Sequence, residues 1–164
     1  MKNMFRSLVF AALLIFCAGC DLSKYPIDDP AVVKIDTRLI GKWRAQEEGK
    51  HYATYTLSRM DDFHYRISSR IKVKRSVQTD EYQGFLSEID NVPFLNVFYK
   101  DDSGNGGYSI LKVMDVRAKS IVVASIKDST LKNLNSPKEV RERITNNLNN
   151  PLFFMDTTTL IRVK

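Results

Sequence analysis

The sequence has few cysteines, whose disulfides can substitute for a hydrophobic core, and few glycines and prolines, which interrupt helices and strands. Only two cysteines, seven glycines and five prolines occur among 164 residues, which excludes a disulfide framework and a collagen-like or low-complexity chain. Apolar residues make up 43% of the chain and aromatic residues 10%, enough for one core. A chain of this length needs neither disulfide nor metal to fold, so we expect one compact domain.

The apolar run near the N-terminus is too short to cross a bilayer as a helix. Leu8–Phe16 supplies nine uncharged residues, whereas a helical span takes about 20 residues. Lys2 and Arg6 precede this run, as in a cleaved secretion signal. We therefore expect residues 1–19 to be a signal peptide, whose removal leaves 23 basic against 19 acidic residues.

The run ends in Cys17-Ala18-Gly19-Cys20, which resembles the lipobox of bacterial lipoproteins. The resemblance implies that Cys20 becomes the first residue, carries diacylglycerol on its thiol and is acylated with palmitate-like chains. Cys17 stands where the family prefers an aliphatic residue, so ordinary secretion and an uncleaved anchor stay open. A redox or zinc role for the two cysteines is not favoured, because zinc would need two more soft ligands.

A lipid anchor predicts attachment to a membrane of the bacterial cell envelope. Residues 20–36 then read as the lipidated cysteine and a flexible tether, because Pro26, Pro30 and neighbouring acidic residues interrupt any apolar period. Asp21 resembles the inner-membrane retention signal of enterobacteria, a rule that other bacteria do not share. Outer and inner membrane therefore both stay open.

From residue 39 the chain reads as short strands separated by turn signals. In residues 63–73 apolar and polar side chains alternate, the pattern of a strand with one wet face. The other expected strands are residues 39–47, 50–58, 81–88, 92–100, 107–117, 119–127 and 158–163. Spacings near ten residues favour a mainly β domain over residues 37–164, an antiparallel, meandering eight-stranded barrel.

One helix is expected, over residues 137–148. Ser136-Pro137-Lys138-Glu139 is a capping box with proline at the first helical position. Residues 94–99 and 121–124 are apolar on both strand faces, so something must cover the sheet from outside. We expect this surface helix to be the cover.

Gly41-Lys42-Trp43, at the start of the first strand, is similar to the Gly-x-Trp motif of lipocalins and related calycins. The resemblance implies a calycin-like barrel whose Trp closes one end, with Arg162 of the last strand stacked on it. The chain departs from the lipocalin pattern in two ways. Its expected helix precedes the last strand, where lipocalins place theirs after it, and the second lipocalin motif is missing. The other interpretation of Trp43 is a Trp in an ordinary β core.

No catalytic constellation is visible, so we expect no enzyme, no cofactor and no metal. His51 and His64 lie in neighbouring strands without a third ligand nearby in the sequence. The loop at residues 101–106 imitates a calcium site, but Lys112 stands where the bidentate Glu should be. Turn geometry explains its Asn and Gly residues.

The densest positive charge lies at residues 70–75. This run predicts a solvated strand face, or a contact with anionic lipid head groups or an acidic envelope polymer. Nucleic acid is not expected as a partner of an envelope protein. Oligomeric state is not predicted.

Two binding functions follow from this anchored barrel. We expect it to bind a small apolar or amphiphilic ligand, or else to be a protein-interaction module such as an envelope-complex subunit or a hydrolase inhibitor. The volume of the lumen separates the two, because inward-pointing aromatic side chains would fill an eight-stranded barrel. The candidates for inward-pointing side chains are Phe63, Tyr65, Ile67, Phe94 and Phe98.

Overall fold

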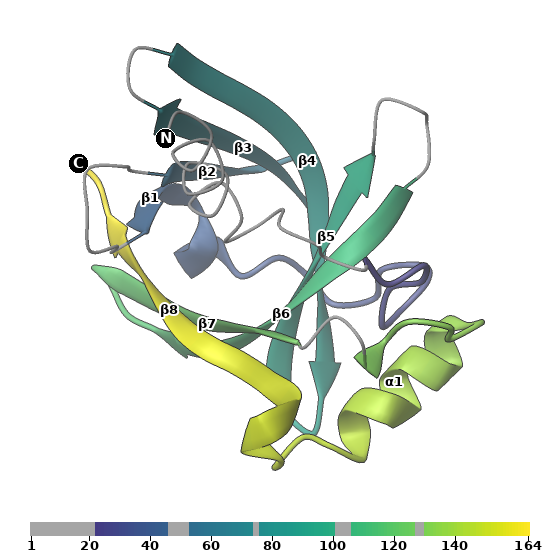
Figure 1. Ribbon diagram of the computed structural model, residues 1–164. Helices are drawn as coiled ribbons and strands as arrows, with labels where there is room; N and C mark the ends of the chain where they lie inside the picture. Colours follow the sequence, from purple (N-terminus) through teal and green to yellow (C-terminus); the bar gives the residue numbers. More distant parts are fainter. Residues whose placement is uncertain (1–21, 46–52, 74–75, 101–105, 127–129) are drawn as a thin grey trace, which may run out of the picture.

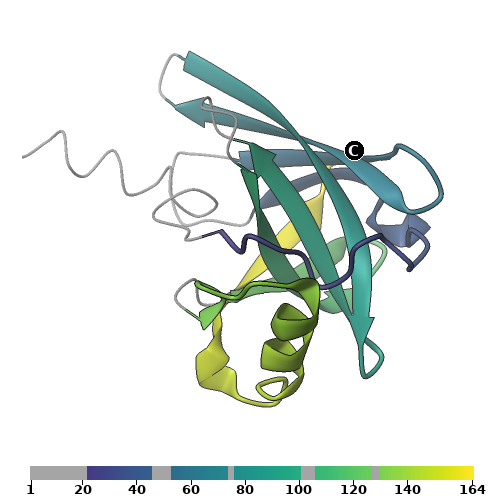
Figure 2. The ribbon, with the colours of Figure 1, turned by 90° about the vertical axis from the view of Figure 1, so that its right-hand side faces the viewer.

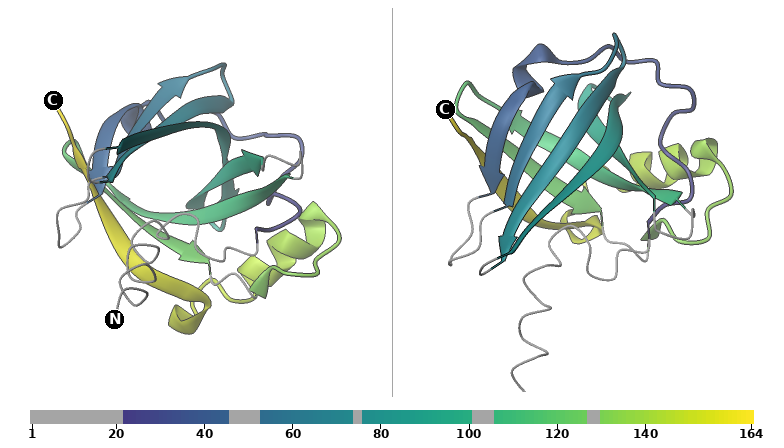
Figure 3. Two further views of the ribbon diagram at one scale, coloured as in Figure 1. Left: turned by 45° about the horizontal axis from the view of Figure 1, so that its top comes forward. Right: turned by 90° about the horizontal axis from the view of Figure 1, so that it is seen from above.

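Eight antiparallel strands form one closed barrel in which each strand pairs with its neighbours in sequence and the last pairs with the first (Figures 1 and 3). The structure, a computed structural model, describes residues 22–45, 53–73, 76–100, 106–126 and 130–164. The predicted fold class, a meandering antiparallel eight-stranded barrel with one late helix, is confirmed. The strands are β1 (Gly41–Ala45), β2 (Ala53–Arg59), β3 (His64–Val73), β4 (Ser76–Ile89), β5 (Val92–Lys100), β6 (Gly106–Val116), β7 (Ser120–Ile126) and β8 (Phe154–Arg162).

Two strands begin earlier than the sequence pattern predicted. β4 starts at Ser76, where residue 81 was expected, and β8 starts at Phe154, where residue 158 was expected. The first half of β4 carries polar side chains on both faces, so no alternation marks it as a strand. Its backbone is held by pairing with β3, from Val73↔Ser76 to Ser68↔Glu81, in a long hairpin.

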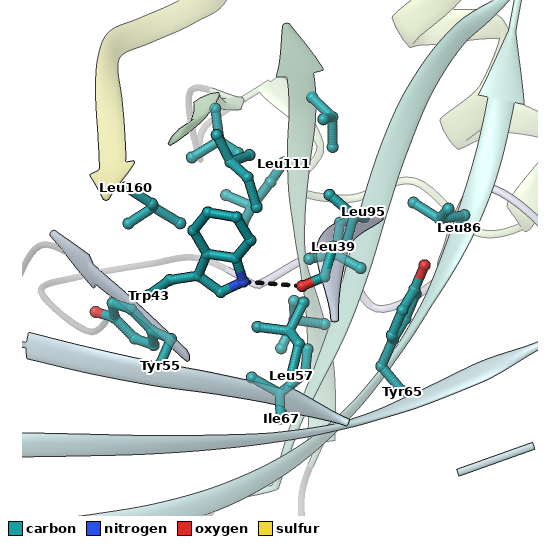
Figure 4. Packing of buried hydrophobic residues seen from close by; sticks show 14 of the residues in the cluster. Leu39, Trp43, Tyr55, Leu57, Tyr65, Ile67, Leu86, Leu95, Leu111 and Leu160 are labelled. Carbon is teal, nitrogen blue, oxygen red and sulfur yellow. Dashed lines mark hydrogen bonds between the residues drawn. The ribbon is translucent and has the colours of Figure 1, made fainter. Parts of the chain in front are cut away.

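The lumen is filled by side chains from all eight strands. Tyr65 and Ile67 point inward, as expected, and pack with Trp43, Leu57 and Leu95 (Figure 4). The expectation for β5 was wrong, because Leu95 and Val97 face the lumen whereas Phe94 packs in a second cluster. The strand is apolar on both faces, so parity alone did not show which face lies inside.

The helix α1 (Pro137–Thr145) covers the second cluster, which contains Phe94 and lies on the outer face of the barrel wall. Ser136 caps it by accepting a hydrogen bond from the Glu139 N–H, as the capping box predicted. Val140 and Ile144 are fully buried against the outer face of the sheet. The other buried members of this cluster are Ile27, Ile89, Phe94, Ile110, Ile126, Leu131 and Phe153.

Residues 22–36 run along the barrel wall, where a flexible tether was expected (Figure 2). Backbone bridges join Ser23 to Tyr108 of β6 and Val33 to Leu86 of β4. Between them Ile27 is 1% exposed, and its N–H donates to Asn96 Oδ1 at 3.0 Å. The segment is therefore part of the folded domain, because its backbone and one apolar side chain complete the barrel's outer surface.

Replacing Ile27 with alanine tests this packing. In a chain of residues 22–164, Ile27→Ala should lower the free energy of unfolding by about 2 to 5 kcal/mol, the usual cost of truncating a buried aliphatic side chain. Val32→Ala is the matched control, because Val32 is 64% exposed in the same segment. Urea unfolding measures the free energy of both variants. If Ile27→Ala loses as little as Val32→Ala, the segment is a flexible tether.

Candidate functional site

One end of the barrel is closed by the short helix η2 (Thr37–Leu39), which enters directly before β1. Asp36 caps η2 by accepting from the Arg38 N–H at 2.9 Å, and the Arg38 guanidinium beside it lowers the pKa of the Asp36 carboxyl. Leu39 enters the core, and its carbonyl accepts a hydrogen bond from Trp43 Nε1 at 2.8 Å (Figure 4). We call η2 the plug. It is thus hydrogen-bonded to β1 through the indole of Trp43.

Arg162 closes the same end from the last strand. Its Cα is paired with that of Trp43, and its guanidinium carbon lies 4.1 Å from the centroid of the Trp43 ring. The guanidinium also donates to three backbone carbonyls, those of Arg38 at 2.8 Å, Ile40 at 3.0 Å and Ala118 at 2.8 Å. One side chain therefore joins η2, the β6–β7 turn, β1 and β8. The calycin resemblance implied the stacking on Trp43 but not the bonds to η2 and to the turn.

Gly41 has no side chain, and the Arg162 guanidinium occupies the space where a Cβ would lie. Its φ of +145° is a conformation that other residues rarely adopt, and a Cβ there would lie 2.3 Å from Arg162 Nη1. The three residues singled out in the sequence, Gly41, Trp43 and Arg162, thus lie together at the closed end. Their contacts with one another close this end of the barrel.

Tyr65 of β3 holds the segment just before η2 by hydrogen bonds to Asp36. Its hydroxyl accepts from the Asp36 N–H at 2.6 Å and donates to the Asp36 carbonyl at 3.1 Å. Burial of the ring raises the pKa of Tyr65 to about 12, so the phenol stays neutral over the ordinary pH range. The neutral hydroxyl is the form that can donate to the carbonyl.

A double-mutant cycle tests the closure. Trp43→Ala should cost about 3 to 5 kcal/mol of unfolding free energy, as large aromatic deletions do, and Arg162→Ala about 1 to 2 kcal/mol from lost stacking and hydrogen bonds. The double variant should lose measurably less than the sum of the two, because the side chains are in contact. Arg117→Ala is the control, since Arg117 is an exposed Arg paired with Asp115. Additive losses would dismiss the stacking.

The lumen above this plug holds a cavity of only about 50 Å³. Its lining is apolar and aromatic, and includes Trp43, Tyr55, Leu95, Leu111, Tyr82 and Tyr99. Tyr82 and Tyr99 are partly buried, with ring centroids 4.5 Å apart. Pockets for drug-sized ligands have about 300–1,000 Å³, so the lumen of this structure is filled.

A larger hollow, about 320 Å³, lies outside the barrel between β6, β8 and the chain that follows α1. Lys112 lines it and donates to the Leu148 carbonyl at 3.2 Å, with its ammonium 4.5 Å from the Phe154 ring centroid. Met114 and Met155 on its wall are 52% and 50% exposed, and neighbouring Leu152 is 77% exposed. Two large apolar side chains, those of Met114 and Met155, are thus exposed on one outer face.

The other sequence candidates are Cys20, the two histidines and the loop that follows β5. Cys20, His51 and the loop at 101–105 lie outside the described residues. His64 Nδ1 lies 2.8 Å from Asp61 Oδ2, and the Phe63 N–H lowers the pKa of the Asp61 carboxyl. In the described ranges no three His, Cys, Asp or Glu side chains are grouped to hold a metal ion.

Sequence reasoning missed a buried polar cluster centred on Asn96. The Asn96 side chain is fully buried, accepts from the Ile27 N–H and donates to Ser87 Oγ at 2.9 Å. Arg141 of α1 adds an ion pair with Asp28 at 2.6 Å. A single Asn inside the apolar stretch at 94–98 was the available signal, since a buried amide needs partners.

Comparisons of the chain with protein-family models, with curated proteins and with solved structures gave no match. The closed eight-stranded antiparallel barrel is compatible with a calycin-like fold. Over the part of the chain that the structure describes, no helix has the length and apolar character needed to cross a membrane.

Proposed function

We propose that the protein is a lipid-anchored module of the bacterial cell envelope that acts by binding another envelope protein, without catalysis. The observation that carries this proposal is the filled lumen. A cavity of about 50 Å³ is smaller than the engineered apolar cavity of about 150 Å³ that accepts benzene. A ligand of ordinary size would have to displace the lumen's side chains.

The anchor in this proposal rests on the sequence pattern that ends at Cys20. A short positive region, an apolar run and small residues before a cysteine are together typical of lipoprotein processing. Two or three acyl chains hold a protein on its membrane more firmly than one. Outer and inner membrane are both compatible with the proposal.

The outer face at β6 and β8 supplies the chemistry for a protein contact. Met114 and Met155 expose flexible, unbranched apolar side chains on the wall of the 320 Å³ hollow. Methionine adapts its shape to different partners, and exposed apolar patches are enriched at protein interfaces. The expected partner offers apolar side chains to this face.

A second candidate function, binding of a small apolar ligand, is favoured by the chemistry of the lumen. The cavity lining is apolar and aromatic, with the Tyr82 and Tyr99 rings among the lining side chains. If those rings moved apart, the space could extend. The two functions differ in whether the purified protein retains a ligand.

Native mass spectrometry of residues 22–164, produced in bacterial cells, separates the two candidates. We expect the mass of the bare chain and no saturable binding of added benzene. Leu111→Ala is the control, because it enlarges the cavity beside Trp43 and should create benzene binding. A discrete apolar molecule retained by the unaltered chain would overturn the interaction proposal and favour ligand binding.

A further inference from the structure

The N-terminal segment meets the barrel at the end opposite to the plug. Ser23 and Tyr108 exchange two backbone hydrogen bonds, of 3.0 and 2.7 Å, near the start of β6. In an antiparallel meander the start of β6 lies at the same end as the start of β4 and the ends of β3 and β5. From there the segment runs to η2 at the closed end (Figure 2).

The path of this segment is fixed by packing. A Cβ on Gly107 would lie 2.6 Å from the Leu22 Cβ, so the two backbones approach closely. Ile27 is buried and bonded to Asn96, and Asp28 is paired with Arg141. These contacts hold the chain against the wall on both sides of Pro26.

The distance left for an anchor is short. Cys20 precedes Ser23 by three residues, which span at most roughly 10 Å when fully extended. The step to a membrane rests on the proposed acylation of Cys20. With acyl chains on Cys20, the barrel end at which β6 begins is held within about one extended tripeptide of the bilayer surface.

The β3–β4 hairpin at this same end carries side chains suited to a lipid surface. Arg70 and Lys72 of β3 are exposed, and Val77 of β4, paired with Lys72, is 48% exposed. Asp80 and Glu81 lie deeper along β4, opposite Ser69 and Ser68. Cations near an anionic membrane contribute about 1 kcal/mol each, and the exposed apolar side chain opposite Lys72 can enter the headgroup layer.

We propose that the protein stands on its membrane with the end opposite to the plug facing the bilayer, and that the β3–β4 hairpin, through Arg70, Lys72 and Val77, contacts anionic phospholipid head groups. The clamp formed by residues 22–28 sets this orientation. The plug and the C-terminus then face away from the membrane. The outer face with Met114 and Met155 stays open to a partner from the side.

Site-specific fluorescence on the full-length, processed protein tests the orientation. Val77→Cys and, as a closed-end control, Lys119→Cys each add one thiol for a bimane label, because Cys20 is acylated and Cys17 is removed with the signal. The labelled proteins are reconstituted into vesicles of phosphatidylglycerol and phosphatidylcholine that contain a lipid with a quencher near its head group. We expect the label at position 77 to lose most of its fluorescence and the label at 119 to keep it.

Two further variants identify the cause. Arg70→Gln with Lys72→Gln should reduce quenching at position 77, as should vesicles of phosphatidylcholine alone, while vesicle attachment persists. Ser23→Pro removes the N–H that donates to Tyr108 and should also reduce the quenching. Quenching at 119 but not at 77, or equal quenching at both, would overturn the orientation. Fatty-acid labelling of the unaltered chain and of Cys20→Ser tests the anchor separately, since equal labelling of the two would refute the anchor itself.

Discussion

The stacking of Arg162 on Trp43 is the contact on which the rest of the barrel depends. A meander closes only if its first and last strands pair, and Trp43↔Arg162 is one of the three residue pairs that join β1 to β8. The indole is fully buried and bonded to the Leu39 carbonyl, while the guanidinium donates to carbonyls of η2 and of the β6–β7 turn. The same two side chains therefore hold both the pairing of β1 with β8 and the plug. Without it the apolar lumen would open to water at that end.

The fold was largely predictable because its main signals are local. Eight strands, their order and the capped helix follow from alternation, turn residues and the Ser136–Glu139 capping box. Gly41, Trp43 and Arg162 came together as a family resemblance implied, although they are far apart in sequence. The early start of β4 could not be predicted, since its pairing with β3 comes from the backbone and leaves no apolar pattern.

Features that depend on which face lies inside were not predictable. Phe94 and Leu95 are equally apolar, and only the helix and Ile27 on the outer face decide that Phe94 lies outside. The proline-containing residues 22–36 read as a tether because their contacts, to Asn96, Arg141 and Tyr108, are made with distant strands and with the helix. The filled lumen also follows from three-dimensional packing. Because the lumen is filled and the N-terminal segment packs on the wall, the surfaces open to a partner lie on the outside of the barrel.

The most direct test of the closure is hydrogen exchange at the indole of Trp43, the only Trp in the chain. Its Nε1–H gives a single, assignable NMR signal in the chain of residues 22–164. Because this group is buried and donates to the Leu39 carbonyl, we predict exchange far slower than that of a free indole, and faster exchange in Arg162→Ala. Exchange at the rate of a solvent-exposed indole in the unaltered chain would contradict the closed barrel end.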